Sequence, residues 1–334
     1  MTIRESHIMG GMHLVILGAG ASIALCYRNA EANRCKLPSM NDLPKVVDMS
    51  DILSQLPEEI LCNNFEELYG NIYEWDANSK FLDEINSRIY RYFAALELPT
   101  EPTIYDYLVM SLRDKDVIAT FNWDPFLIQA LVRNYTHGSN PMLLFLHGNV
   151  AIGYNKEINQ IGPAGSNNTR LGKYYEPTKL MFPVKHKNYT DDAFIQKQWK
   201  LFEESLHYAK RVTVFGYSAP KSDIEAISAM QKAWGTVEER NLEQFELIDI
   251  RPEDEVRESW AGFIHTHHYD YCTDFFQSCI AQYPRRTFEA YMLQCFPVTP
   301  EEGFVEPVPI PEKDIHTFEE LWRWYEPLVE AEEN

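Results

Sequence analysis

The sequence predicts an α/β protein with a doubly wound parallel sheet, and two observations support this prediction. Short apolar runs typical of buried strands alternate along the chain with segments whose apolar residues recur at helical spacing. Four of these runs end in glycine-bearing or polar turns, GAGAS, TFNWD, LHGN and FGYS. Because ligands bind at the carboxyl ends of parallel strands, near the point where strand order reverses, these turns are candidates for a ligand site.

The first half of the chain supplies three predicted strands. A strand over residues 13–17 leads through GAGAS into a helix over residues 22–30. Residues 38–112 have mainly helical spacing and are interpreted as a helical insertion after this first strand–helix unit. The pattern then predicts a strand at 116–121, a helix at 125–134 and a strand at 141–146.

The second half begins with an aperiodic stretch, residues 151–192, which is interpreted as a long loop or a small excursion from the core. Residues 12–296 are interpreted as one core domain, and residues 297–334 as a proline-rich acidic tail with a short helix at 317–331. The remaining core elements are predicted as a helix at 193–209, a strand at 211–215, a helix at 222–234, strands at 244–250 and 263–269, and helices at 272–281 and 285–295.

The composition excludes several classes of protein. Of the 334 residues, 45% are hydrophobic and 13% are aromatic, which excludes a mostly disordered chain. A net charge of −20 repels a nucleic-acid backbone, so direct nucleic-acid binding is not expected, whereas docking onto a basic protein stays open. The apolar run at 12–17 is too short for a signal peptide or a membrane span, so a cytoplasmic protein without membrane contact is expected.

Cysteine and histidine positions predict no metal site. The six cysteines form no C-x-x-C pair, which argues against zinc binding and against a disulfide framework. His265, His267 and His268 lie close together, but no carboxylate–histidine pattern nearby completes a ligand set.

Gly18, Ala19, Gly20 and Ser22 form the first candidate binding turn. The two glycines allow unusual backbone angles and a close approach of a ligand, and a helix N-terminus offers N–H groups to a phosphate. The third glycine of the G-x-G-x-x-G pattern is absent, because Ile23 occupies its position. Taken alone, the motif fits an ordinary tight turn equally well.

Asn122 and His147 are the candidate catalytic residues. Asn122 has the chemistry of a helix cap, but Asp124 lies closer to the next helix, with Pro125 at the first helical position. Asn122 is therefore expected to face the cleft. An imidazole changes charge near neutral pH and can act as a general base, although a lone histidine is more often a packed or capping residue.

Two later strand ends add candidates for binding a nucleotide. Ser218 is suited to a ribose or a phosphate, and Asp249 is suited to accept hydrogen bonds from a ribose diol. Helix capping is the competing role for both residues. Ser222 or Asp223 is expected to cap the helix at 222–234.

In their order along the chain, GAGAS, T-x-N-x-D (Thr120, Asn122, Asp124), H-G (His147, Gly148) and G-Y-S (216–218) resemble the sirtuin superfamily. The chain resembles the SIR2-like domains of bacterial anti-phage defence proteins more closely than the protein deacylases, over about residues 12–270. The resemblance implies a Rossmann-like sheet with an NAD+ pocket. Deacylase sirtuins carry a zinc module with paired C-x-x-C motifs and a stretch ending in F-R, and this chain has neither, which argues against acyl-lysine chemistry.

The resemblance implies that Asn122 orients the ribose hydroxyls or a water molecule and that His147 is the general base. With water as the acceptor, the expected protein is an NAD+ hydrolase that releases nicotinamide and ADP-ribose and depletes NAD in anti-phage defence. A homo-oligomer and a separate partner, a HerA-type ATPase or an Argonaute-like protein, are expected to regulate it. The residues implied to bind NAD+ are Gly18, Ala19, Gly20, Ser22, Thr120, Asp124, Gly216, Ser218 and Asp249.

Other functions stay open on the sequence alone. One is a catalytically weak subunit that binds NAD or ADP-ribose and regulates a partner ATPase. Another is a protein deacylase or an ADP-ribosyltransferase. A nuclease that works with a helicase-like ATPase is disfavoured by the acidic charge and by the lack of a metal-binding pattern.

Overall fold

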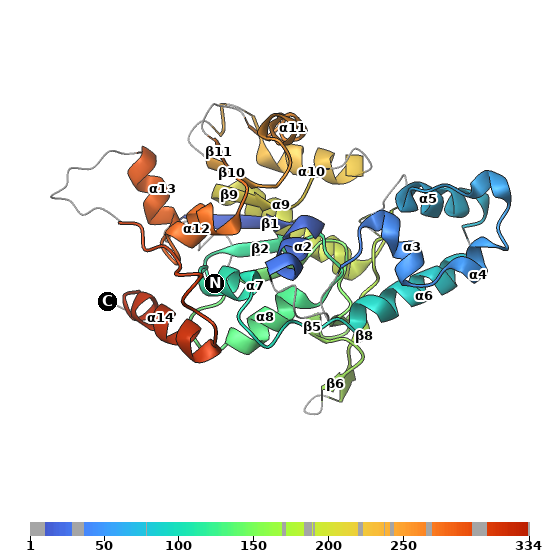
Figure 1. Cartoon of the computed structure of the whole chain (residues 1–334), viewed down its shortest axis with the longest axis horizontal. Helices are drawn as coiled ribbons and strands as arrows, with labels where there is room; N and C mark the ends of the chain where they lie inside the picture. The colour runs from blue at the N-terminus through green and yellow to red at the C-terminus, as the bar shows by residue number, and fades with distance from the viewer. Residues whose placement is uncertain are drawn as a thin grey trace.

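A six-stranded parallel sheet forms the centre of the protein, in the order β11-β10-β9-β1-β2-β3 (Figure 1). This confirms the predicted α/β fold with a doubly wound, Rossmann-like sheet. Its strands are β1 (Met12–Leu17), β2 (Val117–Thr120), β3 (Met142–Phe145), β9 (Ala209–Phe215), β10 (Gln244–Ile248) and β11 (Tyr269–Cys272). The computed structural model describes residues 11–28, 37–77, 79–168, 172–183, 189, 191–219, 223–236, 238–240, 244–264, 269–295 and 306–332.

The strand order reverses at β1. Leu17 at the end of β1 pairs with Thr120 of β2 on one side and with Phe215 of β9 on the other. The carboxyl ends of these three strands therefore lie side by side, at the position where ligands bind in open α/β sheets.

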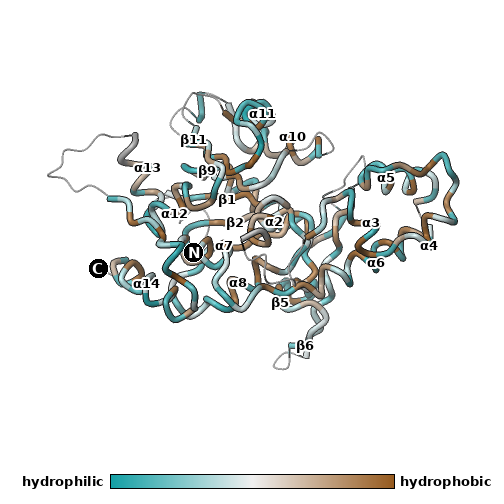
Figure 2. Tube along the Cα trace, viewed as in Figure 1, coloured by the Kyte–Doolittle hydropathy of each residue, from teal (hydrophilic) through white to brown (hydrophobic). Residues whose placement is uncertain are grey.

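Helices cover both faces of the sheet. Leu14 and Ile16 pack with α9 (Ala193–Tyr208), α10 (Ile224–Trp234) and α11 (Glu253–Ser259), whereas Val15 and Leu17 pack with α2 (Ala19–Arg28), α7 (Ile104–Met110) and α8 (Phe126–Asn134). The split follows from the alternation of side chains along a strand. Because both faces are buried, the strands are nearly continuous apolar runs, as the brown colour of β1 and β2 shows in Figure 2.

A group of helices between α2 and α7, here called the helical insertion, extends to one side of the sheet (Figure 1). It has its own apolar core, which also includes Trp123, Val150 and Leu180 from turns at the strand ends. By contrast, α7 packs entirely within the core of the sheet. The helical insertion consists of η1 (Met40–Asp42), α3 (Leu43–Val46), α4 (Ser50–Leu53), η2 (Glu58–Ile60), α5 (Phe65–Trp75) and α6 (Lys80–Ala94).

The stretch predicted as a long loop or a small excursion contains two small antiparallel sheets. One has the order β5-β4-β8 and the other joins β6 to β7. The individual strands were not predicted because they are short and rich in Gly, Asn and Pro, so they lack a clear period of two. They are β4 (Ile152–Asn155), β5 (Gln160–Pro163), β6 (Asn167–Asn168), β7 (Lys173–Tyr174) and β8 (Glu176–Pro177).

Of the strand predicted at 263–269, residues 265–268 lie outside the described residues, and the last described strand begins at Tyr269. This strand is β11. Phe263 packs beside Trp260 and Phe245, on the face of the sheet that α9, α10 and α11 cover. The single helix predicted at 272–281 is replaced by η4 (Phe275–Gln277) and α12 (Cys279–Gln282), followed by α13 (Thr287–Cys295). An apolar residue buried in a helix–sheet interface has the same local signature as a strand residue, which explains the error.

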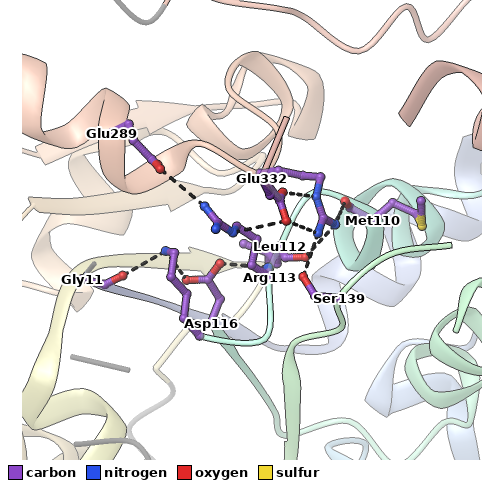
Figure 3. Close-up of polar contacts among 10 residues, drawn as sticks. Gly11, Met110, Leu112, Arg113, Asp116, Ser139, Glu289 and Glu332 are labelled. Atoms are coloured by element: carbon purple, nitrogen blue, oxygen red, sulfur yellow. Dashed lines mark hydrogen bonds and ion pairs between the residues drawn. The ribbon is translucent and has the colours of Figure 1, made fainter. Parts of the chain in front are cut away.

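The C-terminal helix α14 (Phe318–Glu330) packs against α7 on one face of the core. The Tyr325 side chain is fully buried, and its hydroxyl bonds to Ser111 and to the Tyr107 carbonyl. Just beyond the helix, Glu332 contacts Arg285, which also donates to the Met110 carbonyl at 2.9 Å (Figure 3). None of the helices within the described ranges is both long and apolar enough to cross a membrane.

Candidate functional site

The turns after β1 and β9 are pressed directly against each other. The Gly18 N–H donates to the Phe215 carbonyl at 3.0 Å, and the Gly20 N–H donates to the Gly216 carbonyl at 2.9 Å. A Cβ atom on Gly18 would lie 2.5 Å from the Gly216 carbonyl oxygen, so the close approach requires glycine. The Gly20 N–H is therefore engaged within the protein, and α2 begins at Ala19 rather than at the predicted residue 22.

A cavity of about 270 Å³ lies at these strand ends. It brings together predicted site residues from four separate turns: Gly18, Ala19, Asn122, Asp124, His147, Gly216 and Ser218. Its lining also includes residues that were not predicted to form the site: Ile23, Leu37, Pro38, Ser39, Met40, Glu66, Phe93, Phe121, Trp123, Met181, Pro183, Tyr217 and Asp223.

Asn122 is held with a defined orientation at the edge of this cavity. Its Nδ2 donates to the Gly18 carbonyl at 2.8 Å and to Ser22 Oγ at 3.0 Å. Because a carbonyl can only accept, the amide nitrogen must face Gly18, which turns Oδ1 the other way. The arrangement leaves Oδ1 as an acceptor with a fixed direction.

Asp124 lies beside Asn122 and is buried. Burial raises its pKa to about 6, although a hydrogen bond from Ser22 Oγ, 2.8 Å from Oδ2, lowers it. The carboxylate also accepts the Phe126 N–H at 3.2 Å. Pro125 is the N-cap of α8 rather than its first helical residue, so the predicted capping arrangement is displaced by one position.

Ser22 and Thr120 lie behind the cavity instead of in its lining. Ser22 is fully buried, and its hydroxyl links Asp124 with Asn122 and lies 2.7 Å from the Tyr105 hydroxyl. Thr120 Oγ1 accepts the Asn122 N–H at 3.0 Å. Both residues position the side chains that face the cavity.

His147 follows β3 and also lines the cavity. Its ring packs edge-on against Phe121 at 4.9 Å, and its Nε2 lies 3.4 Å from the Tyr189 hydroxyl. Burial raises the pKa of Tyr189 far above its usual value, so this hydroxyl stays neutral. At Gly148, with φ of 75°, a Cβ would lie 2.1 Å from the Lys179 carbonyl oxygen, so a tight glycine turn fixes the histidine.

Tyr217 and Asp223 form the wall that follows β9. The Tyr217 ring stacks on Phe121 with centroids 4.1 Å apart, and its hydroxyl donates to Asp223 Oδ2 at 3.0 Å. Asp223 is the N-cap residue of α10, but its side chain makes no capping hydrogen bond. Its carboxylate supports Tyr217 in the wall of the cavity.

Asp249 is not among the described residues that line the cavity. Its carboxylate is paired with Arg251, with Oδ2 and the guanidinium nitrogen 2.7 Å apart. Its proposed contact with a ribose diol stays a prediction. The histidines at 265, 267 and 268 lie outside the described residues, and within the described ranges no group of three His, Cys, Asp or Glu side chains could hold a metal ion.

The residues that sequence reasoning missed have two origins. Trp123 and Asp223 are close to recognised motifs, so their position at a strand end was the available signal. Glu66 and Phe93 belong to α5 and α6 of the helical insertion, far from any motif. Nothing in their local sequence distinguishes them from other residues of amphipathic helices.

Comparison with known proteins finds similarity only among solved structures. No protein-family model matches the chain, and no curated protein matches it. A crystal structure of a Sir2 homologue–NAD complex is 11% identical, covers 86% of this chain and 93% of its own, and has a TM-score of 0.38. A structure described under the mechanism and regulation of Sir2 enzymes is 12% identical, with coverages of 81% and 91% and a TM-score of 0.35. At such low identities and TM-scores, no activity is carried over from these proteins.

Proposed function

We propose that this protein is an NAD+ hydrolase that cleaves the bond between nicotinamide and ribose, giving nicotinamide and ADP-ribose. One observation carries the proposal: Asn122 and His147 line the same cavity at the reversal of strand order, beside the glycine turns. This is the position at which open α/β sheets bind nucleotides. The order of the motifs along the chain gives additional support.

The proposed reaction breaks the bond between the ribose C1′ and the nicotinamide nitrogen. The bonding electron pair leaves with neutral nicotinamide, and positive charge develops on the ribose. A water molecule then attacks C1′ and loses a proton to His147 as general base. Asn122 Oδ1, whose direction is fixed by the Gly18 carbonyl, accepts a hydrogen bond from this water or from a ribose hydroxyl.

The cavity is suited to limiting the access of bulk water during this reaction. Its walls include the aromatic side chains of Phe121, Trp123 and Tyr217, each less than a tenth exposed. A dry, rigid surround strengthens electrostatic interactions with the reacting atoms and lets one oriented water act as nucleophile.

The test is to incubate purified protein with NAD+ and follow nicotinamide and ADP-ribose by chromatography. His147→Ala and Asn122→Ala should each lower the rate by about 10²- to 10⁴-fold while NAD+ still binds. The proposal fails if wild type, alone or with candidate partners, binds NAD+ without releasing nicotinamide. Release that requires an added acyl-lysine peptide or protein acceptor would instead indicate a deacylase or an ADP-ribosyltransferase.

We further propose that this activity depletes cytoplasmic NAD as an anti-phage effector and that the chain works as a homo-oligomer. A partner such as a HerA-type ATPase or an Argonaute-like protein would restrain it. The support is the similarity of the ordered motifs to SIR2-like defence domains. Light scattering of the purified protein tests the oligomer, and NAD levels in phage-infected cells test the effector role.

A further inference from the structure

A chain of buried hydrogen bonds lies directly behind the cavity. The Tyr105 hydroxyl is 2.7 Å from Ser22 Oγ, and Ser22 Oγ is 2.8 Å from Asp124 Oδ2. The Asn122 amide nitrogen donates to the same serine oxygen at 3.0 Å. All four side chains are less than a tenth exposed. Tyr105 comes from α7 and does not itself line the cavity, so any effect that it has on the site passes through its neighbours.

The number of protons fixes the direction of each bond when Asp124 is ionised. A carboxylate can only accept, so the single hydroxyl proton of Ser22 goes to Asp124. The two lone pairs of Ser22 Oγ then accept from Tyr105 and from Asn122. Tyr105 is therefore the donor of its pair with Ser22. Burial raises the pKa of Tyr105 well above its usual value, so the hydroxyl keeps the proton that it donates.

Protonation of Asp124 would disturb this arrangement. Its Oδ1 already accepts the Phe126 N–H at 3.2 Å, and a proton on Oδ2 would point at Ser22 Oγ. Three donors would then compete for two lone pairs, and a buried donor that loses its partner costs free energy. The Tyr105 hydroxyl thus favours the ionised carboxylate. It opposes the effect of burial, which is the main cause that raises the pKa of Asp124 to about 6.

The first turn of α7 holds Tyr105 in place. Thr103 and Asp106 form a capping box at the start of the helix, with the Thr103 N–H donating to Asp106 Oδ2 at 2.6 Å. Asn134 of α8 donates to the other carboxylate oxygen of Asp106 at 2.8 Å. The Tyr105 ring packs in the apolar core that α2, α7 and α8 share. The protein fold therefore sets the position of the hydroxyl.

We propose that Tyr105 is a positioning residue, whose hydroxyl donates to Ser22 and thereby keeps Asp124 ionised and the Asn122 amide in its observed orientation. Its part in the reaction rests on the proposed function. In that reaction positive charge develops on the ribose, so a carboxylate at the cavity stabilises the transition state and a neutral acid does not. Cys26 of α2 acts electrostatically on Tyr105, and the other titratable side chains of the described lining are Glu66, His147, Tyr217 and Asp223.

The experiment titrates Asp124 in the whole chain, without added ligand, by NMR of isotope-labelled aspartate carboxyl carbons. Asp124→Asn identifies the resonance. The wild-type pKa should be about 6, and Tyr105→Phe should raise it by about 0.5 to 1, as expected for the loss of one hydrogen bond. Ser22→Ala should raise it as well. Adding Tyr105→Phe to Ser22→Ala should have no further effect, because Tyr105 acts through Ser22.

Tyr325→Phe is the matched control. The Tyr325 hydroxyl is also buried and lies 2.7 Å from a serine oxygen, that of Ser111, but it belongs to α14 and lies outside the cavity lining. Both phenylalanine variants should lose similar stability in thermal unfolding, whereas only Tyr105→Phe should change the Asp124 titration. The inference is overturned if Tyr105→Phe leaves this pKa unchanged, if Tyr325→Phe shifts it equally, or if the effects of Tyr105→Phe and Ser22→Ala add in full.

Hydrolysis of NAD+ measures the part of Tyr105 in the reaction. The rate of Tyr105→Phe relative to wild type should fall by about twofold to fivefold between pH 8 and pH 6, because less Asp124 stays ionised in the variant. His147 is common to both proteins, so its own titration cancels in this ratio. The ratio for Tyr325→Phe should not change with pH. A constant ratio for Tyr105→Phe would overturn its part in the reaction.

The two measurements separate this inference from the proposed function. A shifted Asp124 titration, in a protein whose wild type releases no nicotinamide, would support the positioning role and overturn the hydrolase. Nicotinamide release by a protein in which Tyr105→Phe leaves the titration unchanged would support the hydrolase and overturn the positioning role.

Discussion

Gly216, in the turn after β9, contacts the turn after β1 at the point where strand order reverses. Its φ is 64°, and a Cβ atom there would lie 2.3 Å from the Ala21 nitrogen. Both the left-handed backbone and the contact with α2 therefore require glycine. The neighbouring Asn122 depends on the same contact, because its amide is bonded to the Gly18 carbonyl.

Gly216→Ala should lower the free energy of unfolding by about 2–4 kcal/mol, since backbone strain adds to a clash with backbone atoms that cannot move aside. Urea denaturation measures this change. The control is Gly70→Ala in the middle of α5, where a Cβ meets nothing within 4 Å. Removing glycine there should raise stability by about 0.5–1 kcal/mol. Equal stability of the two variants would contradict the role assigned to Gly216.

At the scale of elements, the docking of α14 depends on Arg285. This side chain is almost fully buried. It donates to the Met110 carbonyl at 2.9 Å and to Ser139 Oγ at 2.8 Å, and its second terminal nitrogen lies 2.9 Å from Glu332 Oε2 (Figure 3). One arginine thus connects the end of α7, the segment before β3 and the end of α14.

Glu332→Gln should destabilise the protein by about 2–3 kcal/mol, because it leaves the buried Arg285 charge with neutral acceptors only. Thermal unfolding and limited proteolysis of α14 measure the effect. Glu326→Gln, on the exposed side of the same helix, should change stability by less than about 0.5 kcal/mol. If the Glu332 variant melts like wild type, the ion pair does not hold the helix.

At the scale of the whole molecule, the buried histidine His13 lies near the amino ends of the strands, away from the cavity. His13 is fully buried between Thr287 Oγ1 at 3.0 Å and Thr213 Oγ1 at 2.8 Å. Burial lowers its pKa well below the usual value, and the positive charges of Arg211 and Lys115 lower it further. The folded state therefore holds this imidazole neutral.

Acidification should destabilise the protein through His13. Below the unfolded pKa of about 6.5 the unfolded chain binds a proton that the folded chain does not, so about 1.4 kcal/mol of stability is lost per pH unit. Asp124 acts in the opposite direction: its raised pKa means that its contribution falls as pH rises from 3.8 towards about 6. Denaturation of wild type and His13→Gln between pH 7.5 and 5.5 isolates the histidine, and a stability difference independent of pH would contradict its role.

The sequence by itself determined the sheet and the chemistry of the strand ends. Strands such as β1 and β9 are buried on both faces, so they appear as local apolar runs, and the turns after them carry residues with distinct backbone or polar roles. Asn122 and His147 were predicted as candidates in this way, and both line the cavity. Only the tertiary structure decided which turn residues face the cavity. Ser22 and Thr120 lie behind it, Asp249 pairs with Arg251, and Glu66 reaches it from the helical insertion. These outcomes depend on contacts between segments far apart in the chain, which local periodicity and turn chemistry do not encode.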